Sequence, residues 1–80
     1  MDYIHVKSIG GSSWTIRKDR IAMVINRKSF TDEDLKSMPE LRYRDSCAIL
    51  HLVGESIEYY CDDSYETILN QMGISLEKGL

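Results

Sequence analysis

Two histidines, two cysteines and several neighbouring carboxylates are the residues whose chemistry could support catalysis or metal binding. His5 and His51 each stand inside an apolar run, where a half-buried structural histidine is the usual outcome. Cys47 and His51 share one face of a predicted strand, but they are about 13 Å apart along it and make no tight zinc ligand pair. The sequence therefore predicts neither a catalytic centre nor a metal site.

The carboxylate pairs are better explained as helix starts than as acid–base catalysts. Asp62 and Asp63 end a loop just before a helical pattern, and Asp32–Asp34 follow Thr31 as an acidic first turn. The second group lacks the glycine and the terminal glutamate of a calcium loop. A chain of 80 residues is also too short for a deep pocket of its own. We expect a non-enzymatic protein without a cofactor.

The segment 47–72 is the unit around which the chain is organised. Cys47–Val53 is apolar on both faces and predicts a central strand, and Gly54 begins the turn to a second strand, Ile57–Cys61. A helix over 64–72 follows, with one apolar stripe. That stripe consists of Tyr65, Ile68, Leu69 and Met72.

Both ends of this helix carry capping signals. Asp63 and Glu66 match a capping box, and Ser64 is the alternative cap one residue later. Gly73 stands where a residue with positive φ commonly ends a helix, and Ile74 can make the hydrophobic contact that follows. A helix this short must dock on the sheet to be stable.

The N-terminal part predicts three more strands. Tyr3–Ile9 and Ser12–Arg17 are joined at Gly10-Gly11, which indicates a tight hairpin turn. Ile21–Arg27 reads as a third strand covered on both faces, with a helical turn over 18–23 as the competing interpretation.

The irregular segment 28–45 separates these strands from the central hairpin. Thr31 is the predicted N-cap of a short helix within 30–38, with Phe30 and Leu35 as a hydrophobic staple, and Pro39 ends this helix. Residues 41–44 either extend into the next strand or stay in a loop. The expected fold is α+β and mainly β, a bent five-stranded antiparallel meander or small barrel in one domain, 1–74, followed by a tail, 75–80.

Composition favours a small cytoplasmic protein. No apolar run approaches the length that spans a bilayer, and the first residues do not resemble a signal peptide. Cys47 and Cys61 are then expected as free thiols, although facing hairpin strands would also permit a disulfide. The net charge is −3, yet residues 1–28 carry six bases and two acids, whereas residues 45–80 carry one base and seven acids.

Two groups of residues are candidates for binding. Strands apolar on both faces suggest a homo-oligomer or contact with another protein, and tyrosine and tryptophan are favoured at such contacts. The aromatic candidates are Tyr59, Tyr60, Tyr65, Trp14 and Tyr43. The alternative is a nucleic-acid-binding module that uses the basic segment 17–28. Its candidates are Arg17, Lys18, Arg20, Arg27, Lys28, Arg42 and Arg44.

The layout also resembles a family of very short bacterial β proteins that includes the flagellar accessory proteins of the FlbD type. The resemblance rests on Gly10-Gly11, the run Ile49–Ile57 and the helix segment Ser64–Leu69, and it covers most of residues 3–72. The insert 28–45, Asp62-Asp63 and the tail depart from the family pattern. The resemblance implies a small, non-catalytic, bacterial β domain that can oligomerise. It does not imply the role in motility that members of the family have.

Overall fold

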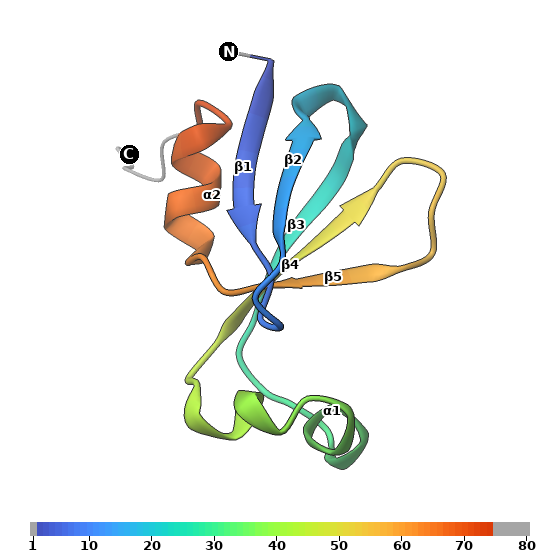
Figure 1. Cartoon of the computed structure of the whole chain (residues 1–80), viewed down its shortest axis with the longest axis vertical. Helices are drawn as coiled ribbons and strands as arrows, with labels where there is room; N and C mark the ends of the chain where they lie inside the picture. Colours follow the sequence, from blue (N-terminus) through green and yellow to red (C-terminus); the bar gives the residue numbers. More distant parts are fainter. Residues whose placement is uncertain (1, 75–80) are drawn as a thin grey trace.

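The computed structural model describes residues 2–74 and arranges five strands in two antiparallel sheets with two α-helices (Figure 1). The expected mainly β class with two short helices is confirmed, and each strand begins and ends within two residues of its predicted bounds. The first sheet holds β1 and β2, and the second holds β3, β4 and β5. The bounds are β1 Tyr3–Lys7, β2 Ser13–Arg17, β3 Ile21–Arg27, α1 Asp32–Ser37, β4 Cys47–Leu52, β5 Glu58–Cys61 and α2 Tyr65–Gln71.

The single meander and the closed barrel expected from the sequence are both wrong. A 3-10 turn, η1 (Lys18–Arg20), redirects the chain after β2, so that β2 does not pair with β3. The helical turn considered for 18–23 therefore exists only over these three residues. The sheets instead meet at one corner, where Asp62 N–H donates to the Lys7 carbonyl at 2.7 Å and Ile9 N–H donates to the Tyr60 carbonyl at 3.1 Å.

The hairpin between β1 and β2 forms where the glycines predict it. Ser8 N–H donates to the Ser12 carbonyl at 2.7 Å, so the connecting loop spans residues 9–11. Gly11 has φ +98°, a conformation that side chains with a Cβ rarely adopt. The position of this turn was therefore predictable from the glycines in the sequence.

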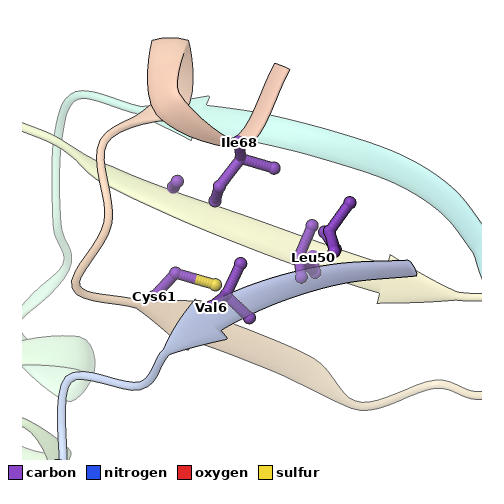
Figure 2. Close-up of a cluster of buried hydrophobic side chains, with 6 residues drawn as sticks. Val6, Leu50, Cys61 and Ile68 are labelled. Atoms are coloured by element: carbon purple, nitrogen blue, oxygen red, sulfur yellow. The ribbon is translucent and has the colours of Figure 1, made fainter. Parts of the chain in front are cut away.

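The main core lies between the two sheets and α2. Figure 2 shows Ile68 of α2 pointing toward β4, with Leu50 on that strand and Val6 of β1 close to the Cys61 sulfur. All members of the cluster are buried, and Trp14, Ile16 and Val24 pack around them. The cluster consists of Ile4, Val6, Ala48, Leu50, Cys61 and Ile68.

Strand β4 is buried on both faces, as its sequence predicts, but β3 is not. Cys47 and Ile49 point away from the main core and are still almost completely buried. In β3, Ala22 is exposed, and Met23 keeps 53% of its surface in solvent. The prediction that β3 is covered on both faces is therefore wrong, because β3 is an edge strand of its sheet.

The insert folds as predicted at its start and differently at its end. Asp34 N–H donates to Thr31 Oγ1 at 3.1 Å, and Thr31 N–H donates to Asp34 Oδ2 at 2.9 Å, which is a complete capping box. Pro39 then begins a second 3-10 helix, η2 (Pro39–Tyr43), so residues 41–43 form neither a strand nor a loop. Leu41 is fully buried and anchors this segment.

Ser64, not Asp63, caps α2. Thr67 N–H donates to Ser64 Oγ at 3.1 Å. The Asp63 carboxylate is used elsewhere and accepts from Lys7 N–H at 2.7 Å. The alternative cap considered from the sequence is therefore correct, and the box of Asp63 with Glu66 is wrong.

The end of α2 follows the glycine signal. Gly73 has φ +83°, and its N–H donates to the Asn70 carbonyl at 3.1 Å. Ile74 N–H donates to the Leu69 carbonyl at 2.9 Å, which completes a Schellman motif. The tail, with Leu76 and Leu80, lies outside the described residues.

Candidate interaction surfaces

Three of the five aromatic candidates gather in one place. Trp14, Tyr59 and Tyr60 line a cleft of about 400 Å³, here called the aromatic cleft, between the loop 9–11 and the segment 37–40. The rings of Trp14 and Tyr59 meet edge to face with centroids 5.2 Å apart. Tyr65 lies elsewhere, against the main core, and Tyr43 is 89% exposed in the insert. The structure therefore divides the aromatic candidates among three regions.

Tyr60 belongs to a polar network on the outer face of β3, β4 and β5. Arg27 NH2 lies 3.0 Å from Glu58 Oε2, and Arg27 NH1 donates to Tyr60 Oη at 3.0 Å. His51 Nε2 is 3.2 Å from the same Glu58 oxygen. The hydrogen bond from Arg27 holds the Glu58 pKa below its usual value, against the opposing effect of burial. Cross-strand register brings these four side chains to the face on which Ile49 lies buried.

The seven basic candidates separate into two groups. Arg17, Lys18 and Arg20 lie at the end of β2 and in η1, just before β3, whereas the other four lie at the far end of β3 or in the insert. Several are already paired: Arg17 with Asp19 at 2.8 Å, Arg27 with Glu58, and Arg44 with Asp62 at 2.7 Å. The exposed candidates that make no ion pair within residues 2–74 are Arg20, Lys28 and Arg42.

The histidines and cysteines make structural contacts. His5 Nδ1 is 3.0 Å from Thr15 Oγ1, and His51 belongs to the network around Glu58. Cys47 and Cys61 are buried free thiols on opposite faces of their sheet. No group of three or more metal-ligating side chains occurs in the part of the chain that the structure describes. No helix within residues 2–74 is long and apolar enough to cross a membrane.

The outer edge of β1 is closed by side chains of the α2 region. The Gln71 amide donates to the His5 carbonyl and accepts from His5 N–H, both at 2.8 Å. Asp63 accepts from Lys7 N–H. These contacts take the place of a neighbouring strand, so β1 offers no free edge at these positions.

The corner where β5 meets β1 determines which backbone groups of β3 point outward. Tyr60 and Asp62 direct their backbone groups toward β1, because each is bonded to the segment 7–9. Successive residues of a strand direct these groups to alternate sides, so Tyr59 must direct its own toward β4, where it is opposite Leu50.

The same alternation continues across β4. The backbone N–H and C=O groups of Ile49 point the opposite way to those of Leu50. They bond to β3, where Ile49 is opposite Ile25. Val24 and Asn26 therefore direct their N–H and C=O groups away from the sheet. Within residues 2–74 these groups have no hydrogen-bonding partner. The outer edge of β3 is open.

An apolar groove of about 320 Å³ runs beside this open edge, between β3 and α2, and is called the β3 groove below. Met23 is 53% exposed on one side of it and Ile74 is 45% exposed on the other. All of its lining residues are uncharged, and Tyr65 is one of them. The others include Ile21, Val24, Leu69 and Met72.

Strand β2 also has an outer edge, but its chemistry differs. Ile4 and Val6 of β1 bond to β2, since their neighbours bond to the α2 region, and this leaves Thr15 directed outward. The side chains of Ser13, Thr15 and Arg17 are polar and exposed. At the β3 groove, by contrast, an open strand edge and an apolar surface coincide.

The comparisons with known proteins add no relative. No family model, curated protein or solved structure matches the chain. The resemblance to FlbD-type proteins stays a prediction.

Proposed function

We propose that this chain is a non-enzymatic protein-interaction domain that binds an extended segment of another protein as an added strand on β3. The observation that carries the proposal is the coincidence of the open β3 edge with the β3 groove. We place this activity in the cytoplasm, where the two free thiols of the chain would remain reduced.

Strand addition suits this surface for a physical reason. The unpaired groups of Val24 and Asn26 can supply main-chain hydrogen bonds, which give affinity regardless of sequence. Alternate side chains of the added strand would then enter the groove beside Leu69 and Met72, where burial of apolar surface contributes both affinity and selectivity.

The proposal is tested by selecting random linear peptides on the folded protein and remeasuring each binder with two proline variants. Asn26→Pro removes an outward N–H of β3, and Thr15→Pro removes an outward N–H of β2 as the matched control. Proline is tolerated on strand edges, so both should fold, as circular dichroism can verify. We expect Asn26→Pro to weaken binding about tenfold or more. Binders that are insensitive to it, or no binders at all, would contradict the proposal.

Nucleic-acid binding is the second candidate function. Its support is local: Tyr43 is 89% exposed beside the exposed Arg42, an arrangement that allows a base to stack next to a cation. The test is fluorescence anisotropy with single- and double-stranded oligonucleotides at low salt. Binding that is lost in the double variant Arg42→Ala/Tyr43→Ala supports this candidate, and the absence of binding ends it.

A further inference from the structure

We infer that the segment bound at β3 belongs to a different protein and carries acidic residues at both ends of its strand. This inference rests on the proposed function and adds the chemistry of the partner. It follows from the charges at the two ends of β3 and from what those charges do to a pair of identical strands.

Basic side chains flank the open edge at both ends. Arg20 immediately precedes β3 and Lys28 immediately follows it, and both are exposed. Neither makes an ion pair within residues 2–74. Among the described residues, the Arg20 side chain donates only to the Val53 carbonyl, at 3.4 Å. The nearby Arg27 differs, because Glu58 already neutralises it. The edge is therefore an uncharged strand between two available cations.

A second copy of β3 offers no charge complement to these cations, because β3 carries no acidic residue. A β-bulge between Ile21 and Met23 also interrupts the strand, so a regular register does not extend to Arg20. An antiparallel pair centred on Val24 brings the Arg20 end of each strand near the Lys28 end of the other, because the pair is symmetric. Like charges close to each other destabilise a strand pair, so charge does not favour this pairing of β3 with itself.

A self-pair centred on Ile25 places no like charges opposite each other, because it matches Arg27 with Met23 and Lys28 with Ala22. It still offers no acid to Arg20 or Lys28, since β3 carries none. A parallel pair in register places each cation beside its own copy. By contrast, a foreign antiparallel strand with an acid at each end can bring these acids to Arg20 and Lys28 together. Charge complementarity thus selects an acid-flanked apolar segment.

The probe is a synthetic nine-residue peptide, Glu-Thr-Val-Thr-Val-Thr-Val-Thr-Glu, compared with the same peptide ending in lysine at both positions. Fluorescence anisotropy with the full chain at low salt measures both. We expect the glutamate peptide to bind about tenfold tighter, because two attractive pairs replace two repulsive ones. The difference should shrink as salt is added, since both cations are exposed. Equal affinities, or tighter binding of the lysine peptide, would overturn the inference.

Charge reversal provides the matched test. The double variant Arg20→Glu/Lys28→Glu should reverse the preference, so that the lysine peptide binds tighter. Lys36→Glu, which changes an exposed charge on α1, should keep the wild-type preference. Loss of both peptides on Asn26→Pro assigns the binding to β3. Edge-dependent binders without acidic ends would refute the acidic partner and leave the proposed function standing. If neither peptide binds and the random selection yields no binder, both the acidic partner and the proposed function are refuted.

Discussion

Gln71 takes the place of a missing strand beside His5. Its side-chain amide donates to the His5 carbonyl and accepts from His5 N–H, each at 2.8 Å, across 66 positions of sequence. One side chain thereby satisfies the two backbone groups that a neighbouring strand would otherwise satisfy. This contact fastens α2 to β1 and closes the β1 edge, while the β3 edge stays open.

Replacing Gln71 by alanine should destabilise the fold and expose the β1 edge. Two hydrogen bonds are lost at a half-exposed site, so we expect the free energy of unfolding to fall by about 1–2 kcal/mol. Urea unfolding followed by circular dichroism measures this change. Asn70→Ala, at an exposed neighbouring position of α2, is the control and should have a smaller effect. Equal effects of the two substitutions would show that the amide contact does not stabilise the fold.

Leu41 should be the residue on which the order of the insert depends. It is completely buried, and no other residue of α1 or η2 is. Leu41→Ala should lower the free energy of unfolding by about 2–4 kcal/mol, because it leaves a cavity. Tyr43→Ala, two positions away and 89% exposed, should change it by less than about 0.5 kcal/mol. If Leu41→Ala proved as mild as Tyr43→Ala, the insert would not be anchored in this way.

The pair of Arg27 and Glu58 should make stability depend on pH. The Glu58 pKa is lower in the folded chain than in the unfolded one, chiefly through the hydrogen bond from Arg27. The pair therefore stabilises the fold above the unfolded pKa of about 4.5, and this contribution is lost as pH falls through the folded pKa. Because both side chains are about one-third exposed, we expect roughly 0.5–1 kcal/mol.

Glu58→Gln isolates this contribution. Its unfolding free energy, measured from neutral pH down to pH values below the unfolded pKa, should fall less steeply than that of the wild type. Glu40→Gln removes a carboxylate that makes no ion pair within residues 2–74, and it should keep the wild-type slope. If Glu58→Gln kept the wild-type slope, the pair of Arg27 and Glu58 would not contribute to the pH dependence of stability.

The two thiols should be inert in the folded protein. Burial raises the pKa of Cys47, and it raises the pKa of Cys61 to about 12. Since the thiolate is the reactive form, labelling by a disulfide reagent should be slow in native buffer and fast in denaturant. The side chains lie on opposite faces of the sheet, so mild oxidation should yield no internal disulfide. Rapid native labelling, or a mass change showing an internal bridge, would contradict this arrangement.

Features set by a few neighbouring residues were predictable from the sequence. Thr31 and Pro39 mark the two ends of α1, and Gly73 ends α2, because caps and breakers act on the adjacent backbone. The choice between Asp63 and Ser64 as the cap of α2 was not predictable. A distant partner, Lys7 N–H, occupies the Asp63 carboxylate.

The arrangement of the sheets and the candidate site depends on contacts between distant segments. The alternation in Ile21–Arg27 fits a strand covered on both faces and an edge strand equally well, so the sequence alone did not reveal that β3 has an open edge. Arg27 and Glu58 meet only through the register of β3, β4 and β5. Their opposite charges were visible in the sequence, but no local pattern linked them.

The most direct test of the account is amide hydrogen exchange of the full chain, measured by nuclear magnetic resonance with and without the glutamate-flanked peptide. The outward amides of Val24 and Asn26 should become protected when the peptide binds, and the Thr15 amide on the β2 edge should not change. Protection at Thr15, protection around the aromatic cleft alone, or no change at Val24 and Asn26 despite binding would contradict strand addition at β3.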